Sequence, residues 1–176
     1  MKMFTYILRL TVTLLIIAAV MAAALAGVNA ITKDKIAEIK VQKTQAAIAN
    51  VLPNAAGLKE IPLSENAGVV KTVYASGDSY AVEVIPSGFN GAITMMVGIE
   101  AGKVTGISIV SHTETPGLGA VAAADNAKGE AFRGQFAGGD GFTVGENVDA
   151  MSGATITSKA VTSGVNAALE YVKSLG

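Results

Sequence analysis

The chain of 176 residues contains no cysteine and no tryptophan, and His112 is its only histidine. Without cysteine it has no thiol nucleophile, no disulfide, no cysteine-ligated zinc and no iron–sulfur cluster. One histidine also excludes a His-pair metal site, a bis-histidine haem and the His-Glu-x-x-His zinc motif. A redox function of this chain would therefore need an organic cofactor.

Charged residues are also scarce. They make up 15% of the chain against 51% hydrophobic residues, and the formal net charge is -1. A nearly neutral chain has no basic surface for nucleic acid. The composition is too apolar for an ordinary soluble domain and too polar for a polytopic membrane protein, so we expect one membrane segment joined to one globular domain.

No charged residue occurs between Leu10 and Thr32. As a helix, these roughly 23 residues would span about 35 Å, enough for a bilayer core of about 30 Å. The sequence therefore predicts a transmembrane helix over residues 10–32. The alternative is a cleaved signal peptide with Val28-Asn29-Ala30 as its cleavage site, although the apolar run exceeds the usual length of about 7–15 residues.

The orientation of this helix is not given by the nearby charges, because lysines after the helix outnumber the basic residues before it. Long domains, however, translocate largely regardless of charge. We expect a single-pass protein of the cell (inner) membrane, with residues 1–9 as a cytoplasmic tail and the large domain on the extracytoplasmic side.

Beyond the membrane segment, apolar residues partly follow helical spacing until Pro53 ends the pattern. We predict a helical stalk over residues 33–56 and one domain over residues 57–176. Within that domain Gly57 to Gly68 is expected to be a loop.

The rest of the domain is expected to have an α+β fold with an antiparallel sheet and a carboxyl-terminal helix. Short apolar runs separated by turn residues predict four strands. We also expect a helix near Ala120–Phe132 in a segment rich in glycine and alanine, and a last helix from Thr157 to Leu175. The predicted strands are Val69–Ala75, Tyr80–Ile85, Ala92–Ile99 and Val104–Val110.

The last helix is preceded by Asp149-Ala150-Met151-Ser152-Gly153-Ala154-Thr155-Ile156-Thr157-Ser158. Small side chains let a backbone approach a ligand, and the free N–H groups of a helix entrance favour a phosphate. The same residues also fit simple helix capping. No histidine lies near to activate a threonine hydroxyl, so we do not expect self-catalysed chemistry at Thr155.

The stretch Asp149–Thr155 resembles the flavinylation motif Asp-x-x-(Ser/Thr)-Gly-Ala-Thr of the FMN-binding domain family. In that family a separate flavin transferase takes FMN from FAD and esterifies its phosphate to the last threonine, which corresponds to Thr155. The resemblance implies that Asp149 serves transferase recognition or orients the loop. It also implies that Ser152, Gly153 and Ala154 shape the loop around the phosphate.

A second segment, His112-Thr113-Glu114-Thr115-Pro116-Gly117-Leu118-Gly119, follows the last predicted strand. By itself it is a tight turn, in which proline fixes φ and glycines allow close approach. We expect His112 to be a hydrogen-bonded structural residue, and Glu114 to be either a flavin contact or a solvated turn carboxylate.

This segment, together with Gly88–Ile93, is similar to the G subunits of the Rnf electron-transport complexes. The related C subunit of the sodium-pumping NADH:quinone reductase is generally longer. The resemblance implies flavin contacts from Glu114, Thr115, Gly117, Leu118 and Gly119. One departure is Ala120, where relatives often have an acidic or polar residue.

The resemblance implies an electron-transfer subunit of a membrane-bound, ion-translocating ferredoxin:NAD oxidoreductase. Its FMN would be covalent on Thr155, its partners would be other membrane subunits and the flavin transferase, and it would have no metal site and no independent catalysis. The alternative is a membrane-anchored assembly or scaffold subunit without covalent flavin. A hydrolase using serine or threonine has little support, because no Gly-x-Ser-x-Gly elbow is present.

Overall fold

The computed structural model describes residues 2–54, 57–63 and 67–175. The chain divides into two units, Met1–Gln42 and Lys43–Gly176. The end of the predicted stalk, residues 55–56, and residues 64–66 of the predicted loop lie outside the described residues.

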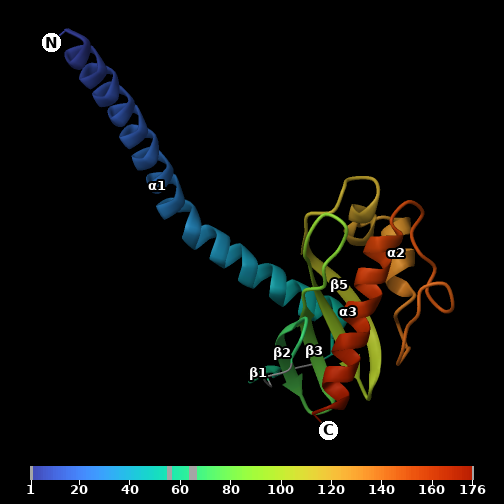
Figure 1. Cartoon of the computed structure of the whole chain (residues 1–176). Helices are drawn as coiled ribbons and strands as arrows, with labels where there is room; N and C mark the ends of the chain where they lie inside the picture. Colours follow the sequence, from blue (N-terminus) through green and yellow to red (C-terminus); the bar gives the residue numbers. More distant parts are fainter. Residues whose placement is uncertain (1, 55–56, 64–66, 176) are drawn as a thin grey trace. The chain divides into compact units, whose positions relative to one another are not determined.

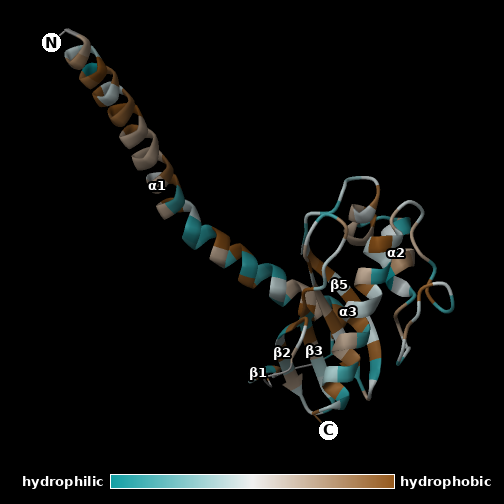
Figure 2. Ribbon diagram, viewed as in Figure 1, coloured by the Kyte–Doolittle hydropathy of each residue, from teal (hydrophilic) through white to brown (hydrophobic). Residues whose placement is uncertain are grey.

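The first helix, α1 (Lys2–Val51), is continuous through the predicted membrane segment and through residues 33–51 of the predicted stalk, whereas residues 52–54 of that stalk are not helical. Large apolar side chains such as Leu14, Ile17 and Leu25 are more than half exposed. Figure 2 shows hydrophobic colours along most of its amino-terminal part and many hydrophilic colours beyond it. A helix that is apolar on all sides without being buried in protein is a candidate membrane span. It ends two residues before Pro53, because proline cannot continue the hydrogen-bonding pattern.

The domain contains an antiparallel sheet in which each strand pairs with the next along the chain. The α+β fold class and the four predicted strands are confirmed, with strand ends displaced by one or two residues. A fifth strand, β1, corrects the prediction that Gly57 to Gly68 is all loop, because Lys59–Ile61 pairs with β2. The strands are β1 (Lys59–Ile61), β2 (Val70–Ser76), β3 (Ser79–Val84), β4 (Ile93–Glu100) and β5 (Lys103–His112).

The main core lies between this sheet and the last helix, α3 (Thr155–Lys173), which contacts strands β2 to β5 (Figure 1). Apolar residues of α3 recur at helical spacing and alternate residues of the strands face them. The buried residues of this core include Val73, Val82, Met95, Val97, Val161, Val165 and Leu169.

The predicted helix near Ala120–Phe132 is wrong as one element. The structure has a 3-10 helix, η1 (Gly119–Ala123), and a separate helix, α2 (Ala127–Gly134). The chain turns between them because the Asn126 side chain accepts from the N–H groups of Lys128 and Gly129 and so begins α2.

The other face of the sheet is covered by the carboxyl-terminal end of α1. Ala47, Val51 and Leu52 form a second buried cluster with Ala81 and Met96, which alternate with residues of the main core. The Thr105 hydroxyl of β5 donates a 2.5 Å hydrogen bond to the Val51 carbonyl oxygen, which lies among the unpaired carbonyls of the helix end. Gly98 of β4 permits this approach, since a Cβ there would lie 2.7 Å from the same oxygen.

Gly98→Ala should therefore separate the end of α1 from the sheet. The added methyl group would meet the Val51 carbonyl and the Thr105 hydroxyl, and overpacking of this kind costs about 1–3 kcal/mol. Thermal unfolding of the full chain in detergent, followed by circular dichroism, should show a lower Tm.

Gly106→Ala is the matched control, because Gly106 is the residue of β5 that pairs with Gly98. A Cβ at Gly106 meets no heavy atom of the described residues within 4 Å. Equal melting temperatures for the two variants would contradict close packing of the α1 end on β4.

Candidate functional site

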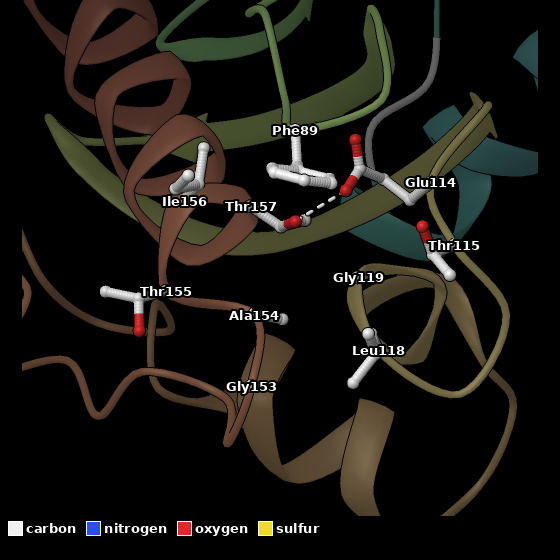
Figure 3. A pocket seen from close by; sticks show the side chains of 10 residues that line it. All are labelled: Phe89, Glu114, Thr115, Leu118, Gly119, Gly153, Ala154, Thr155, Ile156 and Thr157. Atoms are coloured by element: carbon white, nitrogen blue, oxygen red, sulfur yellow. Dashed lines mark hydrogen bonds between the residues drawn. The ribbon is translucent and has the colours of Figure 1, made fainter.

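A pocket of about 340 Å³ lies where three segments of the domain meet. These are the β3–β4 loop, the segment that follows β5, and the first turn of α3. In Figure 3, Thr155 and Thr115 lie on opposite sides of this pocket. Its lining residues are Phe89, Glu114, Thr115, Leu118, Gly119, Gly153, Ala154, Thr155, Ile156 and Thr157. The pocket thus unites residues from both sequence motifs.

Helix α3 begins at Thr155, two residues earlier than predicted, so that Thr155 belongs to its first turn. The N-cap residue, Ala154, makes no side-chain capping bond. The first N–H groups of a helix have no partner within the helix, and they carry the positive end of its dipole. Because Thr155 is exposed, its hydroxyl lies at a helix end suited to a phosphate group.

The loop before α3 is held by a buried serine. The Ser158 hydroxyl donates to the Ala154 carbonyl at 3.0 Å and accepts from the Met151 N–H at 3.0 Å. Between them Gly153 has a φ of +73°, a left-handed conformation that favours glycine. Hydrogen bonds within the chain therefore hold the shape of this loop.

Glu114 is buried, with 5% of its surface exposed. Its Oε2 accepts a 2.5 Å hydrogen bond from the Thr157 hydroxyl, and its Oε1 accepts a 3.0 Å hydrogen bond from the Asn90 N–H. The alternative of a solvated turn carboxylate is wrong, because Thr157 and Asn90 enclose the group from two other segments. Two glycines make this enclosure possible, since a Cβ at Gly88 or Gly119 would contact the carboxylate oxygens.

Further bonds attach the β3–β4 loop to the segment after β5. The Asn90 side chain donates to the Thr113 carbonyl at 2.7 Å, and the Thr113 hydroxyl donates to the Asn90 carbonyl at 2.8 Å. These bonds hold the neighbouring Phe89 at the pocket.

Three large apolar side chains at the pocket remain exposed. Phe89 is 68% exposed, Ile156 55% and Leu118 46%. They come from the three different segments, and in Figure 3 they surround the centre of the pocket. Exposed apolar side chains that gather around a cavity are typical of a ligand site rather than of an inert surface.

The remaining predicted residues lie on a second cavity of about 560 Å³. Asp149, Ser152 and Gly117 line it, and Leu118 lines both cavities. The Gln135 side chain fixes the backbone of Asp149, accepting from its N–H at 2.7 Å and donating to its carbonyl at 3.3 Å. Asp149 itself is exposed. The predicted site residues are therefore split between two neighbouring cavities.

His112 makes a local hydrogen bond. Its Nδ1 accepts from the Glu114 N–H at 3.2 Å. This contact agrees with a structural function for the imidazole, in which it holds the backbone next to the buried carboxylate.

Sequence reasoning did not assign four of the residues that shape the site, namely Phe89, Ile156, Thr157 and Ser158. The last three stand in the hydroxyl-rich stretch at the start of α3, so their position was visible. Their contacts could not be predicted, because Thr157 bonds to Glu114 and Ser158 bonds to Met151, which lie in other turns or segments of the chain.

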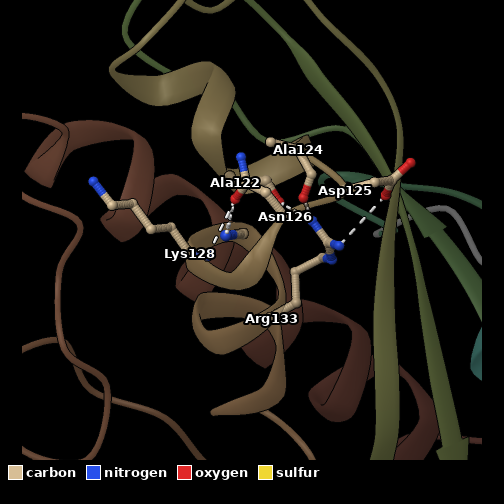
Figure 4. Close-up of polar contacts among 7 residues, drawn as sticks. Ala122, Ala124, Asp125, Asn126, Lys128 and Arg133 are labelled. Atoms are coloured by element: carbon tan, nitrogen blue, oxygen red, sulfur yellow. Dashed lines mark hydrogen bonds and ion pairs between the residues drawn. The ribbon is translucent and has the colours of Figure 1, made fainter.

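Arg133 of α2 supports the segment that carries Leu118 and Gly119 (Figure 4). Its Nη1 donates to the carbonyl oxygens of Ala122 at 2.7 Å and Ala124 at 3.0 Å, and so satisfies the end of η1. The contact between its Nη2 and Asp125 is longer, 3.7 Å, and the Asp125 side chain is fully exposed.

Arg133→Met should weaken the domain, because it leaves the buried Ala122 carbonyl without its donor. Hydrogen bonds from charged donors contribute about 1.5–3 kcal/mol, or a few degrees in Tm for a chain of this size. Asp125→Asn, which removes only the exposed ion pair, should not change Tm measurably. Equal losses in the two variants would contradict the assignment of the effect to the carbonyl bonds.

The fold and the site define a class of protein, one with an FMN-binding domain. The family model described as FMN-binding domain matches residues 88–170, a range that includes every residue lining the pocket. This match supports FMN as the cofactor that the resemblance implied. A second family model, described as RnfG N-terminal region, matches residues 1–51, which correspond to α1.

Whole-chain relatives define the family further. The G subunit of the Na(+)-translocating ferredoxin:NAD(+) oxidoreductase complex of Acetobacterium woodii is 36% identical, with 96% of this chain and 93% of the relative covered. The G subunit of the ion-translocating oxidoreductase complex of Methanosarcina acetivorans is 32% identical, with 94% of each chain covered. A proton-translocating counterpart from Clostridium ljungdahlii is 48% identical over 53% of each chain. The chain belongs to the family formed by the G subunits of Rnf complexes.

Proposed function

We propose that this chain is an electron-transfer subunit of a membrane-bound, ion-translocating ferredoxin:NAD oxidoreductase and carries FMN as a phosphate ester on Thr155. The observation that carries the proposal is the position of Thr155. Its exposed side chain lies in the uncapped first turn of α3, beside a pocket of about 340 Å³.

The residues of this pocket fit the two parts of FMN. The phosphate would lie at the start of α3, where free N–H groups and the helix dipole favour an anion. The ring would lie among Phe89, Leu118 and Ile156, whose exposed apolar surfaces it would cover. Thr115 and Gly119 would contribute close backbone contacts, as Gly153 and Ala154 would around the phosphate. Gly117 and Ser152, which line the neighbouring cavity, would extend these contacts.

Attachment would require the external flavin transferase that the family uses. A bond from the Thr155 oxygen to the FMN phosphorus would form while the bond joining FMN to the AMP part of FAD breaks, and the hydroxyl proton would leave. No imidazole or carboxylate contacts the Thr155 hydroxyl among the described residues, which agrees with an external catalyst. Asp149 is exposed on a backbone fixed by Gln135, and we assign it to recognition by the transferase.

Bound FMN would accept electrons from one redox group in the complex and deliver them to another, both held by partner subunits. A covalent tether suits this function, because the cofactor cannot dissociate while its redox state changes. The chain itself would position the flavin and tune its potential. The family and the apolar α1 together indicate membrane association.

We also propose how the chain is placed in the membrane. Residues 1–9 would be cytoplasmic, residues 10–32 would cross the membrane, residues 33–56 would form the stalk, and residues 57–176 would lie on the extracytoplasmic side. The ion pathway would lie in other subunits, because residues 10–32 carry no ionisable side chain at membrane depth. Relatives named for sodium and for proton translocation agree with this, since this chain is similar to the G subunits of both kinds of complex.

Thr155→Ala should abolish covalent flavin completely while α3 remains folded, because alanine is the best helix former. The full chain, made in a host that has the transferase, would be denatured in SDS and examined for in-gel flavin fluorescence. Retention of fluorescence by this variant would refute the attachment site.

Thr143→Ala is the matched control, since Thr143 is another exposed threonine of the domain and should leave the fluorescence unchanged. Intact mass of the wild-type chain distinguishes the scaffold alternative. An esterified chain should be heavier by the mass of FMN less one water, whereas a scaffold without covalent flavin would have the mass of its amino acids alone.

A further inference from the structure

The pocket wall contains a buried acid without a cationic partner. Among the ten lining residues only Glu114 is ionisable. The two ion pairs found in the described part of the chain, Lys35–Glu38 and Arg133–Asp125, do not include it. A buried charge is costly unless hydrogen bonds or dipoles compensate it. Because burial of this acid costs free energy, its position indicates a function other than stabilising the fold.

The groups that donate hydrogen bonds to the Glu114 carboxylate are both uncharged. Both carboxylate oxygens accept, one from the Thr157 hydroxyl and one from the Asn90 N–H, and hydrogen bonds donated to both oxygens stabilise the charged form of a carboxyl group. Thr157 lies in the first turn of α3, so the charge also lies near the positive end of that helix dipole.

Two opposite electrostatic effects therefore act on the same pocket. The start of α3 favours negative charge in it, whereas the carboxylate of Glu114 disfavours negative charge. Buried charges are poorly screened by salt. Reduction of a bound flavin ring by two electrons, with uptake of one proton from solvent, would leave the ring with one additional negative charge. Under the proposed function the electrons would come from the redox groups of partner subunits.

We propose that Glu114 holds the reduction potential of the flavin low by presenting to the pocket a negative charge that no cationic side chain of the described residues neutralises. The inference rests on the proposed function, because it requires FMN in this pocket. The hydrogen bonds to Asn90 and Thr157 fix the distance at which this charge acts, since they attach the carboxylate to the two other segments of the pocket wall.

Glu114→Gln tests the charge with little change of shape. In the full chain, made with the transferase and purified in detergent, in-gel fluorescence is measured first and the midpoint potential of the flavin second, by spectroelectrochemical titration. We expect covalent flavin to be retained and the equilibrium to shift at least tenfold toward the reduced form, a rise of about 30 mV for a two-electron couple. An unchanged or lower potential would overturn the inference.

Glu146→Gln is the matched control, because it removes an exposed carboxylate outside the pocket and should leave the potential at the wild-type value. A rise equal to that of Glu114→Gln would show a general effect of net charge and would also overturn the inference. Wild-type protein without covalent flavin would refute the proposed function itself, so the two failures are distinguishable.

Glu114→Asp separates charge from geometry. It keeps a carboxylate but shortens the side chain, so the hydrogen-bond geometry changes while the charge stays, and the potential should remain below that of Glu114→Gln. A rise equal to that of Glu114→Gln would assign the effect to pocket shape and overturn the inference. Where Glu114→Gln does not retain flavin, Glu114→Met supplies the uncharged side chain, and an unchanged or lower potential in that variant would overturn the inference as well.

Discussion

The hydrogen bond between the Thr157 hydroxyl and the Glu114 carboxylate joins the start of α3 to the segment after β5. The same carboxylate accepts from Asn90, so the β3–β4 loop belongs to the same junction. Three segments far apart in sequence thus converge on one buried carboxyl group. A buried carboxyl group must remain hydrogen-bonded to be tolerated, and the glycines at 88 and 119 must remain small for it to fit. The pocket lies beside this junction, because Glu114 and Thr157 are both among its lining residues.

Three hydroxyl-bearing residues at the start of α3, Thr155, Thr157 and Ser158, differ in burial and in their contacts. Ser158 is fully buried and holds the preceding loop, and Thr157 is buried against Glu114. Neither caps the helix, and the N-cap position is taken by Ala154, which has no polar side chain. Only Thr155 among these three hydroxyls stays exposed. Among the described residues no N-cap side chain accepts from the first N–H groups of α3, and free N–H groups at a helix start favour an anion.

Elements that depend on the pattern of neighbouring residues could be predicted from the sequence, whereas contacts between distant residues could not. The strands β2 to β5 follow from apolar runs between turns, and the apolar span follows from the missing charges of residues 10–32. Strand β1 was missed because Lys59–Ile61 is short and largely exposed, and its pairing with β2 defines it. The helix near 120–132 was wrong because Asn126 begins a new helix, an effect of one side chain on two N–H groups. The burial of Glu114 could not be predicted, because it depends on a threonine 43 residues away.

The strand β4 packs against the end of α1 on one face and against α3, which begins at the pocket, on the other. Its alternate residues face opposite sides, so Met95 and Val97 pack in the core under α3 while Met96 and Gly98 meet the end of α1. Because α3 begins at the pocket and packs on β4, the helix that carries Thr155 and the end of α1 rest on opposite faces of the same strand.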